Sequence, residues 1–80
     1  MKKLKYNSYI LLRDCIKKRN NQLLSFIDDN NRTVINNGSI NDLRGIVCDE
    51  LIMCGFTDGK INDYGEQLEI LIDELGQLIF

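Results

Sequence analysis

The chain contains no histidine and no proline, and its three cysteines form an odd set. Without histidine it lacks the commonest general base and the usual partner of cysteine in zinc sites. The odd cysteine count and the absence of an apolar signal segment favour a reduced, cytoplasmic protein. No stretch approaches the roughly 18 apolar residues of a transmembrane helix, so we expect a soluble chain that does not enter membranes. With no proline, nothing forces a helix to kink.

The residues that often carry chemistry lack the spacing of a metal site. Cys48 and Cys54 are six residues apart, so a helix turns them away from each other. Together with Cys15 they are expected to be small apolar core residues. The Asp58-Gly59 pair resembles the centre of an EF-hand loop, but the ligand positions around it lack side-chain oxygens. We therefore expect neither a metal nor a cofactor.

Two pairs of adjacent carboxylates, Asp49-Glu50 and Asp73-Glu74, lie in the second half of the chain. Neighbours on a helix point about 100° apart, so neither pair shares a site as a catalytic acid and base would. Both pairs are interpreted as solvated surface. Because the sequence also lacks a nucleophile paired to a base and a glycine-rich phosphate loop, it predicts a protein that is not an enzyme.

Charge is divided between the two halves of the chain. Residues 1–40 carry eight basic and three acidic residues, a net charge of +5, whereas residues 41–80 carry two basic and nine acidic residues, a net charge of −7. The total of −2 therefore hides a dipolar molecule. An acidic half of this kind can steer and hold a cationic partner, which favours a binding module.

Apolar residues recur with the helical period in four stretches, which predicts a single all-α domain, a small bundle of about four helices without a sheet. The Gly55-Phe56 pair is typical of a Schellman motif at the end of a helix. Asp58-Gly59 is typical of a turn, and Asn62 or Asp63 is expected to be the N-cap of the last helix. Leu51, Leu68, Leu71 and Leu75 are expected in the core, with Ile79 continuing the last apolar stripe. The predicted helices run from Lys3 to Arg19, from about Leu23 to Asn36, from Ile40 to Cys54, and from about Asp63 to Ile79.

One apolar residue of the last helix is predicted to face away from the core. Ile70 lies opposite Leu68 on the helix and is flanked by carboxylates, as an anchor within a charged rim would be. Ile52 is likewise opposed to the core side of the third helix. The predicted partner-binding residues are Asp49, Ile52, Asp58, Asp63, Glu66, Glu69, Ile70, Asp73 and Glu74.

Residues 43–56 and 61–75 carry a family resemblance. In size, acidity and lack of catalytic groups the chain is similar to the small helical immunity proteins of bacterial polymorphic toxin systems, in particular those of contact-dependent growth inhibition. It also resembles the immunity proteins of nuclease colicins in size and charge, but it has no counterpart of their Tyr-Tyr-Pro segment. The resemblance implies a cytoplasmic 1:1 inhibitor that covers the basic cleft of a cognate toxin, more often an RNase than a DNase, and that does not contact nucleic acid directly.

Two other functions remain open on the sequence. The basic first helix, with Lys17, Lys18 and Arg19 at its end, could lie along a phosphate backbone as part of a nucleic-acid-binding regulator. The helix after the segment 37–41 offers only Arg44 as a base, which is poor for a recognition helix. The opposite charges of the two halves also suit an adaptor that self-associates head to tail.

Overall fold

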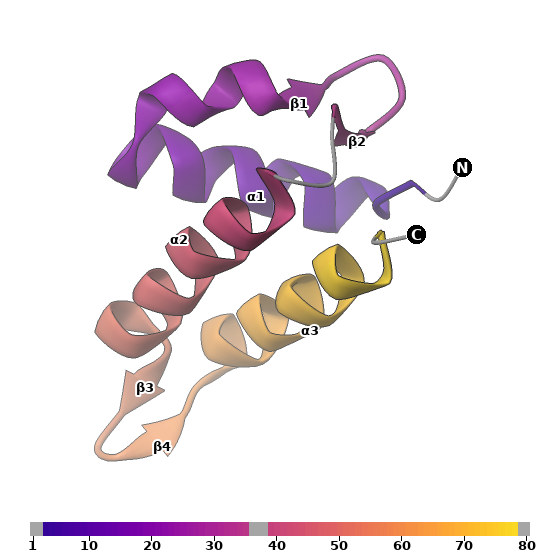
Figure 1. Ribbon diagram of the computed structural model, residues 1–80. Coiled ribbons are helices and arrows are strands. Elements are labelled where there is room, and N and C mark those ends of the chain that lie inside the picture. The colour runs from indigo at the N-terminus through magenta and orange to yellow at the C-terminus, as the bar shows by residue number, and fades with distance from the viewer. Residues whose placement is uncertain (1–2, 36–38, 79–80) are drawn as a thin grey trace.

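The computed structural model describes residues 3–35 and 39–78. Within these ranges, three α-helices and one 3₁₀ helix alternate with two pairs of very short strands. Helices α2 and α3 lie side by side, α1 packs across both, and η1 runs back beside α1 (Figure 1). The elements are, in chain order, α1 (Tyr6–Arg19), η1 (Asn21–Phe26), β1 (Ile27–Asp28), β2 (Thr33–Val34), α2 (Ile40–Cys54), β3 (Phe56–Thr57), β4 (Lys60–Ile61) and α3 (Asp63–Gln77).

The first, third and fourth predicted helices are confirmed as α1, α2 and α3, but the second is helical only up to Phe26, as a 3₁₀ helix, and its continuation beyond that residue is wrong. Its residues form η1 and the antiparallel pair β1–β2, in which Ile27 lies opposite Val34. The Asp28 carboxylate accepts hydrogen bonds from the backbone N–H groups of Asn30 and Asn31, at 3.1 and 3.2 Å. Such local side-chain bonds compete with helical ones, so the chain turns here. The domain is thus mostly helical without being purely all-α, and residues 36–38, where the predicted helix ended, lie outside the described residues.

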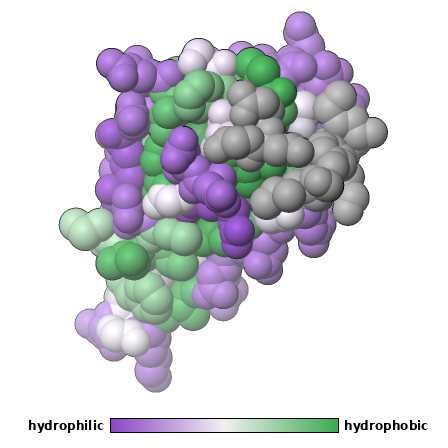
Figure 2. Space-filling view, in the orientation of Figure 1, coloured by the Kyte–Doolittle hydropathy of each residue, from purple (hydrophilic) through white to green (hydrophobic). Residues whose placement is uncertain are grey.

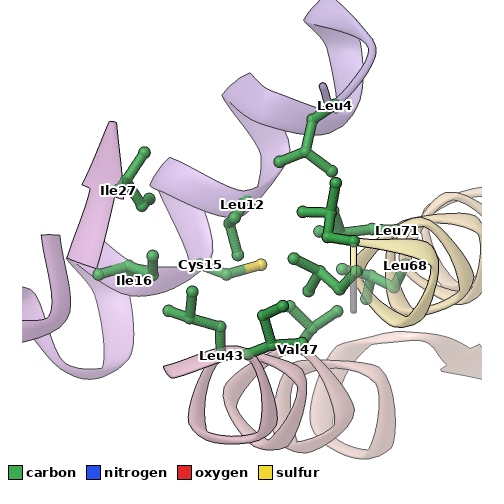
Figure 3. Packing of buried hydrophobic residues seen from close by; sticks show 12 residues of the cluster. Leu4, Leu12, Cys15, Ile16, Ile27, Leu43, Val47, Leu68 and Leu71 are labelled. Atoms are coloured by element: carbon green, nitrogen blue, oxygen red, sulfur yellow. The ribbon is translucent and has the colours of Figure 1, made fainter. Parts of the chain in front are cut away.

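The core lies where α1 meets the α2–α3 pair. Leu12 and Cys15 of α1 lie between Leu43 and Val47 of α2 and Leu68 and Leu71 of α3, and Ile16 lies on the side of Ile27 and Leu43 (Figure 3). The predicted core positions Leu68, Leu71 and Leu75 are confirmed, whereas Leu51 is only half-buried against the cluster. Ile79 lies outside the described residues. Of the cysteines, Cys15 is buried as expected, Cys48 is half-buried, and Cys54 is exposed, so the core assignment of Cys54 was wrong.

Two glycines let the end of α2 touch the start of α3. A Cβ added to Gly65 would lie 2.2 Å from the carbonyl oxygen of Gly55, and a Cβ on Gly55 would lie 3.1 Å from the Cα of Gly65. The predicted Schellman stop is wrong, because Gly55 has a φ of −87° and Phe56 is half-exposed instead of folding back. Gly55 is therefore needed for close backbone approach and not for a left-handed conformation.

The connection between α2 and α3 is a two-residue hairpin, which the expected absence of sheet missed. Thr57 pairs with Lys60, and the intervening Asp58 and Gly59 have φ values of 53° and 78°, as the central residues of a type I′ turn do. The predicted turn at these two residues is confirmed. The predicted cap is also confirmed, since the Asn62 side chain accepts a 2.7 Å hydrogen bond from the N–H of Gly65.

Candidate docking groove between the first and last helices

A shallow groove runs between α1 and α3, and it is the candidate functional site. Its central hollow has a volume of about 340 Å³. A second hollow continues it toward Lys3 and Leu78, and a third continues it toward Ile10 and Asp14. The residues that line the central hollow are Lys5, Asn7, Ser8, Leu11, Gln67, Ile70 and Glu74. We call this feature the α1–α3 groove.

Hydrogen bonds at the start of α1 hold the two walls of the groove together. The Ser8 hydroxyl donates to Glu74 Oε1 at 2.9 Å, and the backbone N–H of Lys5 approaches Glu74 Oε2 at 3.4 Å. Just before the helix, the N–H of Leu4 donates to the carbonyl of Arg32 at 2.8 Å. Glu74 therefore fixes the spacing of the walls, which leaves the groove formed before any partner arrives.

The groove has an apolar floor that water still reaches. Ile70 is 53% exposed, Ile10 is 38% exposed and Tyr6 is 62% exposed, while Leu11 between them is half-buried. Large apolar side chains at the centre of a groove are the usual anchors of a protein interface. The polar groups around them, from Asn7 and Gln67, can donate and accept hydrogen bonds with a bound chain.

The exposed charged residues of α3 are all acidic. The helix carries five carboxylates and no Lys or Arg. Within residues 3–35 and 39–78, none of the five takes part in an ion pair, since the ion pairs there involve only Asp29 and Glu50 as acids. Four of the five, Asp63, Glu66, Glu69 and Asp73, are exposed. These four residues are called the α3 carboxylates below.

The structure separates the predicted partner-binding residues into two groups. Ile70 and Glu74 line the groove, and the α3 carboxylates lie on the same helix. Asp49 and Ile52 are exposed on α2, and Asp58 is exposed in the turn of the β3–β4 hairpin. None of these three is among the residues that line the groove, and the hairpin projects at the far end of α3 from the chain termini (Figure 1). Ile70 therefore lines the groove, whereas Ile52 lies outside its lining.

The prediction that Glu50 is solvated surface is wrong. Its side chain is buried, with 1% of the residue exposed. The carboxylate accepts hydrogen bonds from Lys18 Nζ at 3.0 Å, from Arg19 at 2.8 and 3.1 Å, and from the Tyr64 hydroxyl at 2.6 Å. We call these four residues the Glu50 cluster. The sequence signal was present, because Glu50 follows Leu43 and Val47 on the core side of the helix.

The Glu50 cluster changes the protonation behaviour of its members. Burial alone would raise the pKa of Glu50, but the hydrogen bonds from Tyr64, Lys18 and Arg19 outweigh it and lower that pKa to about 2. Burial and the hydrogen bond to Glu50 raise the pKa of Tyr64. Burial also raises the pKa of the nearby Cys15 thiol to about 11, so Cys15 stays protonated and unreactive at neutral pH.

The basic first helix is partly neutralised within the fold. Lys18 and Arg19 pair with Glu50, and Arg13 pairs with Asp29, which also accepts a 2.6 Å hydrogen bond from the Tyr9 hydroxyl. These bases are oriented toward carboxylates of the same chain, which weakens their use as a phosphate-binding surface. This arrangement disfavours the nucleic-acid-binding alternative.

Comparison of this chain with protein-family models, with curated proteins and with solved structures found no match. Among the described residues, no three cysteine, aspartate or glutamate side chains are grouped to hold a metal ion. Nor is any helix in the described ranges of sufficient length and apolarity to cross a bilayer. The candidate site therefore rests on the geometry and charge of the α1–α3 groove.

Proposed function

We propose that this protein is a non-catalytic binding module that neutralises a cationic protein, as an immunity protein neutralises its toxin. The observation that carries the proposal is the composition of α3: five carboxylates, no base, and the half-exposed Ile70 among them. Because α3 supplies no base of its own, its carboxylates repel one another, and this repulsion is relieved when a cationic surface covers them. A catalytic role has no comparable support from the groove.

Charge and apolar contact have different tasks in this proposal. The α3 carboxylates attract a basic partner over several ångströms and speed its association. Ile70 and the half-buried Leu11 then exclude water at the centre of the contact and slow dissociation. A toxin nuclease suits this arrangement, because its cleft binds phosphate groups and carboxylates can occupy the same positions. Inhibition of such a toxin, 1:1, is the specific form of the proposal.

The test is protection of cells against the protein encoded by the neighbouring gene, co-expressed with this chain. We expect wild type to restore growth and the triple variant Glu66→Lys, Ile70→Asp, Asp73→Lys to fail, because it reverses the charge of α3 and removes the anchor. A matched control variant, Asp49→Lys, Ile52→Asp, Asp58→Lys, makes the same kinds of change on α2 and in the hairpin instead of on α3 and should still protect. Circular dichroism and soluble protein level establish that both variants are folded.

Kinetics with the purified partner separate the two parts of the mechanism. Glu66→Lys should lower the association rate by about tenfold at low salt and less at high salt. Ile70→Ala should act mainly on the dissociation rate. Protection by the folded α3 variant would contradict the site. Tight, salt-sensitive RNA or DNA binding by the wild type, without binding to the neighbouring protein, would contradict the function and favour the regulator.

A further inference from the structure

The walls of the α1–α3 groove offer few backbone hydrogen bonds to a bound chain. Every residue that lines the three hollows belongs to α1, to α3 or to the residues that adjoin the ends of these helices, and none lies in a strand. Most N–H and C=O groups of a helix are already bonded within it. An extended segment would therefore lay unpaired backbone groups against the groove, which is costly, whereas a helical segment satisfies its own. The walls favour a helix as the occupant.

The length and the floor of the groove also fit a short helix. Along α3 the lining residues extend from Gln67 to Leu78, which at a rise of 1.5 Å per residue is about 17 Å, or three helical turns. The apolar floor receives Ile70 from one wall and Ile10 and Leu11 from the other. An amphipathic helix presents apolar side chains at i, i+3, i+4 and i+7 as one stripe that can contact both walls.

The rim of the groove on α3 is acidic. Three exposed carboxylates share the side of the helix that carries Ile70, because they lie three, four and seven positions from it. They are Asp63, Glu66 and Asp73. None of them forms an ion pair within residues 3–35 and 39–78. Lysine or arginine side chains beside the apolar stripe of a bound helix would meet these carboxylates.

The bases beside the groove do not outweigh this rim. Lys3 and Lys5 line the hollows, and Lys17 is exposed one turn beyond Asp14. Against these three bases stand the three carboxylates of the rim together with Asp14 and Glu74, which also line the hollows. The surroundings are thus acidic on balance, and a basic occupant is favoured over an acidic one.

We infer that the α1–α3 groove binds a basic amphipathic helix of the partner, about three turns long. The apolar stripe of that helix covers Ile70 and Leu11, and its basic side chains face Glu66 and Asp73. The inference rests on the proposed function, since it specifies the structural element by which the cationic partner is held.

Two synthetic peptides of about 14 residues test the inference. Both contain leucine and lysine in equal numbers, so their charge is the same. In one, leucine recurs at the helical spacing i, i+3, i+4 and i+7, and in the other it alternates with lysine as in a strand. Calorimetry at low salt, below the concentration at which either peptide self-associates, should show the helical peptide to bind at least about tenfold more tightly. It should also shift the backbone amide signals of Asn7, Gln67 and Ile70 in NMR spectra of the protein.

Ile70→Gln and Met53→Gln form a matched pair of variants, because each replaces an exposed apolar side chain with a neutral polar one. Met53 is 72% exposed in the last turn of α2 and lines none of the hollows. Figure 2 shows other hydrophobic side chains on the surface at this end of the molecule. Ile70→Gln should weaken binding of the helical peptide by about tenfold, and Met53→Gln should leave it unchanged. Circular dichroism verifies that both variants are folded.

Several results would contradict the inference. Equal affinity for the two peptides, or tighter binding of the alternating one, would exclude a preference for a helix. Weaker binding in Met53→Gln but not in Ile70→Gln would place the helix outside the groove, and absence of binding by either peptide would contradict the inference altogether. The co-expression test uses neither peptide, so each of these results leaves the proposed function to be decided by protection alone.

Discussion

The carboxylate of Glu50 joins all three α-helices of the described structure. It lies on α2 and accepts hydrogen bonds from Lys18 and Arg19 of α1 and from Tyr64 of α3. A buried charge is costly unless it is paired and hydrogen-bonded, and Glu50 has both kinds of compensation. Removing it leaves two bases without their partner and the hydroxyl of the half-buried Tyr64 without its acceptor. Much of the placement of α1 on the other helices therefore depends on one side chain.

We expect Glu50→Gln to lower the free energy of unfolding at neutral pH by about 2 to 3 kcal/mol. The pKa of Glu50 is lower in the folded chain, about 2, than its ordinary value of 4.5. Its contribution is thus complete above pH 4.5 and is lost as the pH falls toward 2. The difference between wild type and Glu50→Gln should shrink across this window, as measured by urea unfolding at several pH values.

Glu69→Gln is the matched control for this experiment, because Glu69 is exposed on α3. Its effect should stay within about 0.5 kcal/mol at neutral pH. Equal effects of the two substitutions, or a Glu50 difference that does not change with pH, would contradict the assigned role of the Glu50 cluster.

At the level of whole elements, the pairing of α2 with α3 is set by close backbone approach and by a short turn. Gly55 and Gly65 bring the two backbones together, and the Asp58-Gly59 turn has the left-handed conformation that a two-residue hairpin requires. The Asn62 cap then starts α3 without an intervening loop. The β3–β4 hairpin thus determines the direction in which α3 leaves.

Gly65→Ala is expected to destabilise the fold by about 2 kcal/mol or more, although alanine is the better helix former. The added methyl group would collide with the carbonyl of Gly55 and with the side chain of Ile61. Gly45→Ala is the control, because a Cβ at Gly45 meets nothing within 4 Å. It should stabilise the protein by about 0.5 to 1 kcal/mol. Equilibrium unfolding in urea measures the free energy of unfolding of both variants. If Gly65→Ala raised this free energy, the close approach of the Gly55 and Gly65 backbones would be contradicted.

On the scale of the whole molecule, the basic half and the acidic half of the chain differ in how their charged side chains are paired in the fold. Three bases of α1 pair with carboxylates of the same chain, whereas the α3 carboxylates form no ion pair in the described ranges. The acidic half therefore presents its charge to solvent more completely than the basic half does. A small net charge of −2 conceals this asymmetry.

We expect the protein to bind immobilised polylysine at low salt and to release it as salt is raised, while heparin retains it poorly. The triple variant Glu66→Gln, Glu69→Gln, Asp73→Asn should elute from polylysine at distinctly lower salt. A control with the same net charge, Asp42→Asn, Asp49→Asn, Asp58→Asn, removes exposed acids from α2 and the hairpin and should elute later than the α3 variant. Identical elution of the two variants would show that net charge alone governs binding.

The sequence predicted three of the helices because their periodic apolar residues meet one continuous core. It failed from Ile27 to Val34, where local hydrogen bonds to Asp28 outweigh a helical pattern that is interrupted by the Asn30-Asn31 pair. Ile70 was recognised as exposed because its position on the helix alone determines that. The helical pattern places Glu50 on the core side of α2, but the bases that compensate its charge lie more than 30 positions earlier in the chain, so no local pattern shows how a carboxylate can be buried there. The groove itself was missed for the same reason, since its walls come from the first and last helices.

The contact between α1 and α3 also has a consequence for the order in which the molecule takes shape in a living cell. Ribosomes release α1 first, yet Leu4, Leu12 and Ile16 are buried in a cluster that includes Leu68, Leu71 and Leu75 of the last helix. The Ser8–Glu74 hydrogen bond likewise spans 66 positions of the chain. The apolar side chains of α1 therefore remain exposed to solvent until α3 has been translated. Chaperones that bind exposed apolar segments can bind the nascent chain during that interval.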